Sequence, residues 1–154
     1  MDRGDRAHRS SPGYSAPATL HLVGTTSWTE VPAVLSYEVS DPFAVRIGFG
    51  EAGEPTDDGI TWLLGRELLA AGLERPAGDG DVRLWPARTS GDVLYLHLRA
   101  PSGEALFEVS RATVAAVLQR TEELVPSGEE TAALDVDEEL AVLLSGGGAD
   151  PGAR

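Results

Sequence analysis

The segment 60–86 places the strongest constraint on what this 154-residue chain can fold into. A short apolar run at 60–64 predicts a buried strand, and an amphipathic helix over 65–71 follows it directly. Gly72 suits the position just after a helix, where a backbone with positive φ is favourable. A second apolar strand at 82–86 ends in Trp-Pro. The segment therefore predicts a domain that mixes sheet and helix.

The helix at 65–71 is expected to bury only one of its sides. Leu64, Leu68 and Leu69 lie on the side predicted to pack inward, whereas Arg66 and Glu67 are predicted to face water. Pro76 prevents the helix from restarting nearby because it lacks a backbone N–H group.

Alternating apolar residues predict further strands on both sides of this segment. Asp41-Pro42 lies between two of them and favours a tight turn, so 33–49 is predicted to be a hairpin. Helices are predicted after Ser110, as an N-cap, and again from Asp135. The predicted fold is α+β: an antiparallel, partly open β-barrel-like sheet of about seven strands with two or three helices. The strands are expected at 18–24, 33–39, 43–49, 60–64, 82–86, 92–99 and 104–109.

Composition divides the chain into one domain with two polar ends. Residues 1–17 are rich in Arg, Ser, Gly and Pro and lack the apolar stretch of a secretory signal, so they are predicted to be a disordered leader. Residues 18–145 are predicted to form a single domain, and 146–154 a disordered tail. No apolar run is long enough for a membrane span.

The charge balance disfavours nucleic acid as a partner. The net charge is −13, and the 12 basic residues are all arginine. Binding to a phosphate backbone depends on clustered Lys and Arg side chains, which are few here.

No catalytic or metal-binding motif stands out. The chain has no cysteine, and its histidines, His8, His21 and His97, are not spaced as a zinc set; the last two are expected at the surface. Neither a phosphate-binding loop nor a serine nucleophile elbow occurs. We therefore expect no metal, no cofactor and no enzymatic activity.

The three tryptophans are the best candidates for contacts with a partner, because tryptophan often anchors protein interfaces. Trp62 lies in an apolar strand and is predicted to be in the core. Trp28 is predicted in a polar loop, and Trp85 and Pro86 at the end of a strand. Trp28, Trp85 and Pro86 are the candidate partner-binding residues, and plain packing is the alternative for each.

Several segments together resemble the SsgA-like proteins of sporulating actinobacteria. They are the Ser-Asp-Pro-Phe-Ala-Val stretch at 40–45, the Trp-x-x-Gly-Arg-Glu-Leu-Leu-x-x-Gly-Leu-x-x-Pro stretch at 62–76, the Gly-x-Gly-Asp-Val-Arg-Leu-Trp-Pro stretch at 78–86, and Pro-x-Gly-Glu-Ala-Leu at 101–106. The resemblance runs from about Leu20 to Leu144. The chain departs from it in its long leader and in Gly65, where alanine is expected.

The resemblance implies a Whirly-like fold, a trimer and a non-enzymatic role in cell division and sporulation. It further implies a cytoplasmic protein at the division septum, whose SsgB-like relatives bring the tubulin-like GTPase FtsZ to septum sites. FtsZ or its membrane-associated regulators are thus the expected partners, and the subfamily stays open. A single-stranded nucleic-acid-binding module is the alternative, suggested by the Whirly-like fold alone.

Overall fold

The computed structural model describes residues 13–50 and 61–134. They form a seven-stranded antiparallel sheet in the order β4-β3-β2-β1-β7-β6-β5. The strands are β1 (Gly13–Val23), β2 (Trp28–Glu38), β3 (Ala44–Phe49), β4 (Thr61–Gly65), β5 (Val82–Pro86), β6 (Val93–Ala100) and β7 (Gly103–Ser110). The helices are α2 (Arg66–Gly72) and α3 (Arg111–Leu124), and a further helical segment covers 130–134. The predicted α+β fold is confirmed.

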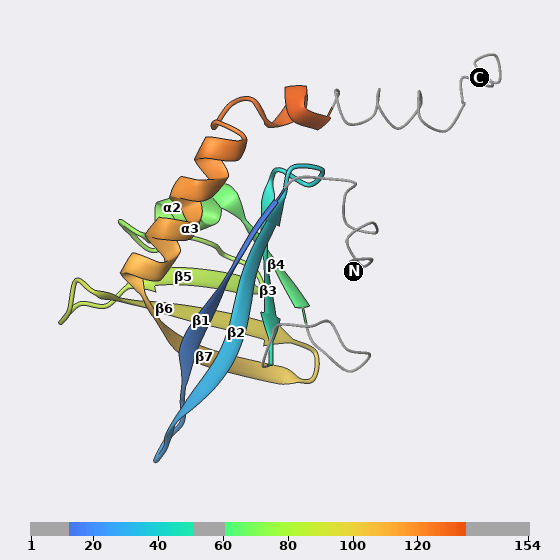
Figure 1. The fold of residues 1–154 in the computed structure, drawn as a ribbon. Helices are drawn as coiled ribbons and strands as arrows, with labels where there is room; N and C mark the ends of the chain where they lie inside the picture. The colour runs from blue at the N-terminus through green and yellow to red at the C-terminus, as the bar shows by residue number, and fades with distance from the viewer. Residues whose placement is uncertain (1–12, 51–60, 135–154) are drawn as a thin grey trace.

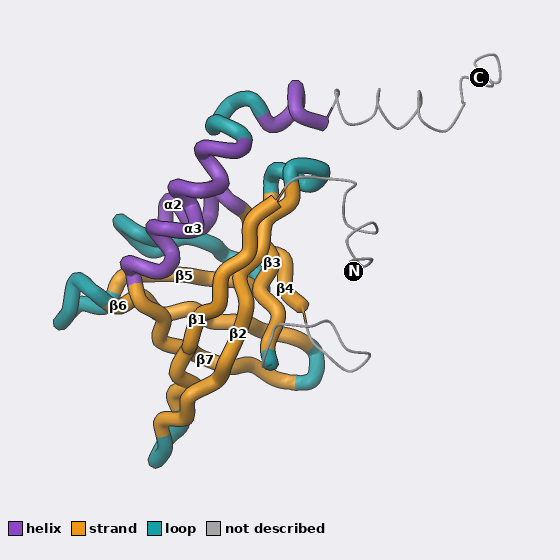
Figure 2. The backbone as a smooth tube through the Cα atoms, in the orientation of Figure 1, coloured by secondary structure: helices purple, strands orange, loops and turns teal. Residues whose placement is uncertain are grey.

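The sheet curls into a barrel that stays open between its edge strands β4 and β5 (Figure 1). Two meanders build it, β1 to β4 and β5 to β7, and the pairing of β7 with β1 joins them. Helices α2 and α3 lie side by side over one end (Figure 2). The tip of the long β1–β2 hairpin points away from the helices.

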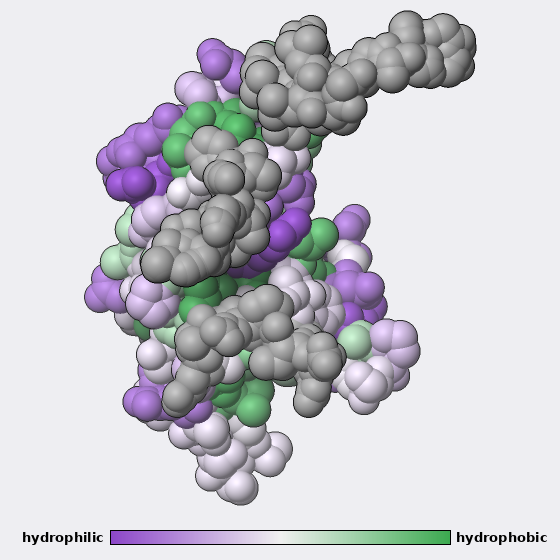
Figure 3. Space-filling view, turned by 45° about the vertical axis from the view of Figure 1, so that its right-hand side comes forward, coloured by the Kyte–Doolittle hydropathy of each residue, from purple (hydrophilic) through white to green (hydrophobic). Residues whose placement is uncertain are grey.

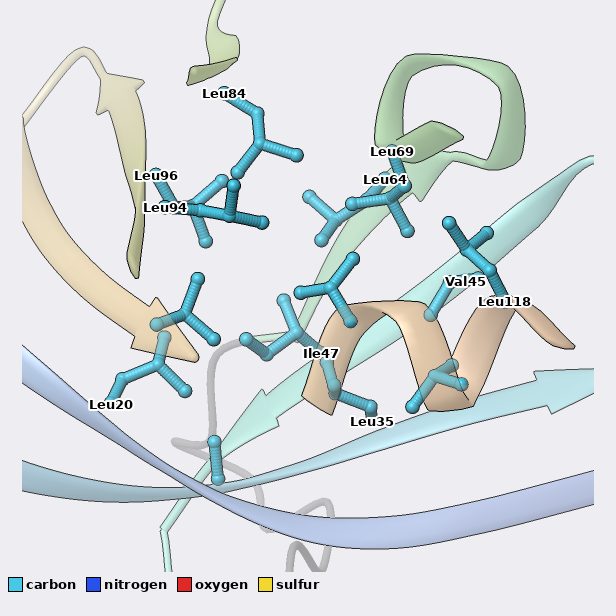
Figure 4. Close-up of a cluster of buried hydrophobic side chains, with 14 of the residues drawn as sticks. Leu20, Leu35, Val45, Ile47, Leu64, Leu69, Leu84, Leu94, Leu96 and Leu118 are labelled. Atoms are coloured by element: carbon cyan, nitrogen blue, oxygen red, sulfur yellow. The ribbon is translucent and has the colours of Figure 1, made fainter. Parts of the chain in front are cut away.

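The core lies inside the curled sheet and beneath the two helices (Figure 4). Leu20, Leu64, Leu84 and Leu94 are each at most 2% exposed, as expected for inward positions of alternating strands. A cavity of only about 20 Å³ remains among these side chains, and apolar groups alone line it. Since it offers no polar partner to a water or a ligand, the barrel interior is packing and not a binding site.

Two local signals behave as the sequence predicted. At the β2–β3 turn, the Asp41 amide donates to the Glu38 carbonyl over 2.9 Å. The Ser110 hydroxyl accepts from the Thr113 amide over 3.3 Å and caps α3. Both signals depend on neighbours in the sequence, which explains why they could be recognised there.

The sheet begins earlier than predicted, because β1 starts at Gly13 and so includes residues assigned to the disordered leader. Residues 13–17 pair in register with the end of β2, from Gly13 opposite Glu38 to Pro17 opposite Val34. The Tyr14 ring also lies beneath the Arg120 guanidinium, 4.8 Å away. Pairing with a distant strand thus overrides a weak local β preference.

Three further predictions need correction. Trp28 is not in a loop: it is the first residue of β2, opposite Val23. Arg66 is buried at 3% exposure and does not face water. Gly72 is the last residue of α2, and its φ is not positive. A glycine is needed there because Leu84 packs against it. The predicted helix from Asp135, the tail and residues 1–12 lie outside the described residues.

Candidate protein-interaction surface

Five outward side chains from five neighbouring strands form one row across the sheet. Register places Glu30 of β2 opposite His21 of β1, His21 opposite Glu108 of β7, Glu108 opposite Tyr95 of β6, and Tyr95 opposite Trp85 of β5. His21, Glu108, Tyr95 and Trp85 each follow a buried residue of their strand, so they face outward. Glu30 lies on the same side because it is paired directly with His21. We call these five residues, together with Trp28, the outer row.

Trp28 lies at one end of the outer row and is held there by two contacts. Its ring stacks on the His21 ring, with centroids 4.0 Å apart and planes 4° from parallel. Its indole Nε1–H donates to the Glu108 carboxylate over 3.3 Å. Trp28 is nevertheless 58% exposed. A large aromatic ring that is fixed in place and still open to solvent is a suitable anchor for a partner.

Trp85 lies at the other end of the outer row, and Pro86 follows it as the last residue of β5. The Trp85 ring packs at a tilt against Tyr95, with centroids 5.9 Å apart, and both residues are half-buried. A shallow groove of about 660 Å³ runs beside them, with Arg75, Arg88 and Glu74 on its rim. The structure therefore brings both predicted partner-binding tryptophans onto the outward side of the same sheet, which their separation in sequence could not indicate.

Carboxylates dominate the charge around Trp28. The Glu30 side chain is 75% exposed, and its carboxylate lies 3.8 Å from Nε2 of the His21 ring. Glu108 accepts from Trp28, and neither carboxylate is paired with an arginine among the described residues. Further along the sheet, His97 and Glu104 approach to 2.6 Å. Both histidines lie on the outward side of the sheet, each with one carboxylate.

Other apolar side chains are exposed near the β4 edge. Phe43 is 50% exposed and Leu63 of β4 is 56% exposed. On the face shown in Figure 3, hydrophobic residues form patches that polar side chains separate. Phe43 and Leu63 are therefore a second candidate for contact with another chain.

Arg66, predicted to face water, is instead a buried structural residue. From the first position of α2, its Nη1 donates to the carbonyls of Thr121 (3.1 Å) and Val125 (2.7 Å) at the end of α3. Its Nη2 donates to the Glu130 carboxylate over 2.5 Å. Carbonyls at a helix end lack partners within the helix, and a cation suits them. The spacing of Leu64 and Leu68 around Arg66 could not indicate these contacts, because the partners of Arg66 lie more than fifty residues further along the chain.

Three titrating groups near Arg66 have shifted pKa values. The hydrogen bond from Arg66 holds the pKa of the Glu130 carboxyl below its usual value. The pKa of Glu122 is also lowered, chiefly because the Ser127 hydroxyl donates to its carboxylate. Burial raises the pKa of the Tyr37 phenol, whose hydroxyl donates to the Pro42 carbonyl over 3.0 Å. All three groups support the packing of the helices and turns.

The described residues contain no cluster of three or more His, Cys, Asp or Glu side chains that could hold a metal ion. Within the same ranges, no helix is long and apolar enough to cross a membrane. The fold is thus a small antiparallel-barrel domain, and its outer row carries exposed aromatic and acidic side chains.

The particular family follows from comparison with known proteins. The family model described as "Streptomyces sporulation and cell division protein, SsgA" matches residues 31–130. The chain therefore belongs to the SsgA family, as the resemblance predicted. Sporulation-specific cell division protein SsgB from Frankia casuarinae is 48% identical over 118 residues, 76% of this chain and 80% of the relative. SsgB from Streptomyces coelicolor is 42% identical over 130 residues, 82% and 93% of the two chains.

A solved structure agrees with both the fold and the family. The SsgA-like sporulation-specific cell division protein from Thermobifida fusca superposes with a TM-score of 0.74 at 33% identity, covering 92% of this chain and 98% of that one. The chain is thus an SsgB-like member, with a role in cell division and sporulation.

Proposed function

We propose that this protein is a non-enzymatic adaptor that helps position FtsZ and the septation machinery during sporulation. The observation that carries the proposal is the relatedness to proteins named for sporulation-specific cell division, at up to 48% identity. The outer row supports it, because an exposed, fixed tryptophan with two carboxylates suits docking better than catalysis. We place the adaptor in the cytoplasm, at the division septum.

Co-sedimentation with FtsZ polymers tests this role. The wild-type protein is expected to pellet with assembled FtsZ and to stay in the supernatant without it. Trp28→Ala should reduce the pelleted fraction, whereas Thr29→Ala, at the exposed neighbouring position, should not. Equal pelleting with and without FtsZ would contradict the proposal. A fluorescent fusion that shows no enrichment at septa would contradict the proposed location.

The adaptor is further proposed to act as a homo-oligomer, a trimer. Strand β4 ends the sheet, so its outer backbone groups have no strand neighbour among the described residues. Its exposed Leu63 and the nearby Phe43 add apolar surface. Unpaired strand edges favour association with another chain. Light scattering at micromolar concentration should give three times the monomer mass, and Leu63→Arg should lower it; a wild-type monomer would contradict the proposal.

Single-stranded nucleic-acid binding is the second candidate, favoured by the aromatic rings on an open sheet face. Such binders combine base stacking with a positive groove. Here the rings alternate with Glu30 and Glu108, and the net charge is −13. Tight, salt-dependent binding of an oligothymidine in an electrophoretic shift would favour this candidate over the adaptor.

A further inference from the structure

The environment of Trp28 has the features of a site for a cationic side chain. One side of the indole ring is stacked on His21, and the residue is still 58% exposed. The hydrogen bond to Glu108 fixes the ring in the plane of the stack. A fixed aromatic face attracts Arg and Lys side chains through the negative potential above the ring. Little conformational freedom is then lost when a ligand binds.

Two carboxylates flank this ring at a useful spacing. Glu30 and Glu108 lie on either side of His21 in register, two strand gaps apart. Neighbouring strands are about 4.8 Å apart, so the two Cα positions are separated by about 10 Å. The His21 ring, with Trp28 stacked on it, lies between these two positions, so a cation would approach over the outer face of the Trp28 ring, within reach of both carboxylates. Since neither carboxylate is paired with an arginine in the described part of the chain, their negative charge is available to a ligand.

We infer that Trp28, Glu30 and Glu108 form a docking site for an arginine or lysine side chain in a basic segment of a partner protein. The cation lies over the Trp28 ring and pairs with the two carboxylates. This inference rests on the proposed adaptor function, because it states the chemistry of the segment that the adaptor binds. Charge complementarity selects the occupant: the same carboxylates repel the phosphates of a nucleic acid.

The test is a titration of the full-length, ¹⁵N-labelled protein followed by the indole N–H signals of Trp28, Trp62 and Trp85. The probe is the peptide acetyl-Gly-Arg-Gly-Arg-Gly-amide, with its citrulline analogue as the uncharged control. Trp28→Phe assigns the Trp28 signal. The arginine peptide should shift that signal saturably at millimolar concentration, and added salt should weaken the shift. The citrulline peptide should shift it far less, and the Trp62 signal should stay in place.

Variants that each remove one negative charge distinguish binding at this site from attraction by the net charge of the protein. Glu108→Gln and Glu30→Gln should each weaken peptide binding by about two- to fivefold, the range for exposed ion pairs. Glu129→Gln removes the same charge at an exposed position after α3 and should leave binding unchanged. Because the Glu30 side chain is 75% exposed, Glu30→Gln keeps the test valid even if Glu108→Gln perturbs the fold.

Several results would overturn the inference: an unmoved Trp28 signal, equal shifts with the citrulline peptide, or equal weakening by Glu129→Gln. A larger shift with oligothymidine would assign the face to nucleic acid, and dissociation of an oligomer by the peptide would assign it to a second copy of the chain. The titration contains no FtsZ, so its failure leaves the adaptor role standing. Normal peptide binding without FtsZ co-sedimentation would instead overturn the FtsZ partner alone.

Discussion

The Arg66 guanidinium donates to the Val125 carbonyl over 2.7 Å and so joins the start of α2 to the residue that follows α3. The same side chain contacts Glu130. Helix α3 is therefore held over the barrel by the buried Arg66 guanidinium as well as by its buried apolar residues Val114, Val117 and Leu118.

Replacing Arg66 with methionine should destabilise the protein strongly. The substitution leaves the buried Val125 carbonyl without its Arg66 donor, at a cost of about 1–3 kcal/mol, and it also removes the cation that pairs with Glu130. Chemical denaturation of the variant, read against the wild type, measures this loss. The double variant Arg66→Met/Glu130→Met should recover part of the stability. A single variant as stable as the wild type would contradict a structural role for Arg66.

Acidification should weaken the protein through the same contact. The folded pKa of Glu130 is lowered by Arg66, so its stabilising effect is present above the unfolded pKa, about 4.3. That effect is lost as the pH falls through the folded value. The free energy of unfolding should therefore decrease on going from pH 6 to pH 3 or so. Glu130→Gln should flatten this decrease, although Glu122, whose pKa is also lowered, retains part of it; Glu129→Gln should have the wild-type profile.

Two glycines of the same segment should respond differently to alanine. A Cβ on Gly72 would lie 2.8 Å from the Leu84 Cβ and 2.4 Å from its Cδ2, so Gly72→Ala should cost about 1–3 kcal/mol, as overpacking does. Gly65 has φ −59°, and its nearest neighbour would lie 3.8 Å away. Gly65→Ala should thus change stability by less than about 0.5 kcal/mol. Equal melting temperatures for the two variants would contradict this packing.

Removing the Tyr37 hydroxyl should loosen the turn at Asp41-Pro42. Tyr37 is 1% exposed, and its hydroxyl donates to the Pro42 carbonyl. Tyr37→Phe leaves that carbonyl without its donor, at a cost of about 1–3 kcal/mol. Thermal unfolding checks the loss. Tyr95→Phe serves as the control, because Tyr95 is half-buried on the outward face; the same loss in both variants would argue against a specific role for the buried hydrogen bond.

Substitutions at the two ends of the outer row should affect stability and partner binding differently. Trp85 is half-buried against Tyr95, so Trp85→Ala should lower stability by about 1.5–3 kcal/mol and affect folding more than partner binding. Trp28→Ala should change the melting temperature little and reduce binding. Unchanged melting of Trp85→Ala with lost FtsZ co-sedimentation would reverse these assignments.

Much of the fold followed from local patterns in the sequence. Alternating apolar residues predicted a strand at 92–99, and Leu94, Leu96 and Leu98 of β6 are all buried. The Ser110 cap and the Asp41-Pro42 turn were also recognisable, since their hydrogen bonds span five residues or fewer. By contrast, the start of β1 was missed, because residues 13–17 are held mainly by pairing with β2.

By itself the sequence determined the α+β class, the seven strands, the family and the candidate residues Trp28, Trp85 and Pro86. Only the tertiary structure decided that Trp28 and Trp85 lie in one row on the outward side of the sheet and that Arg66 is buried under α3. The physical reason is the distance along the sequence between the residues that interact. Alternation and capping depend on near neighbours, whereas strand register and the partners of a buried charge depend on residues that folding brings together from across the chain.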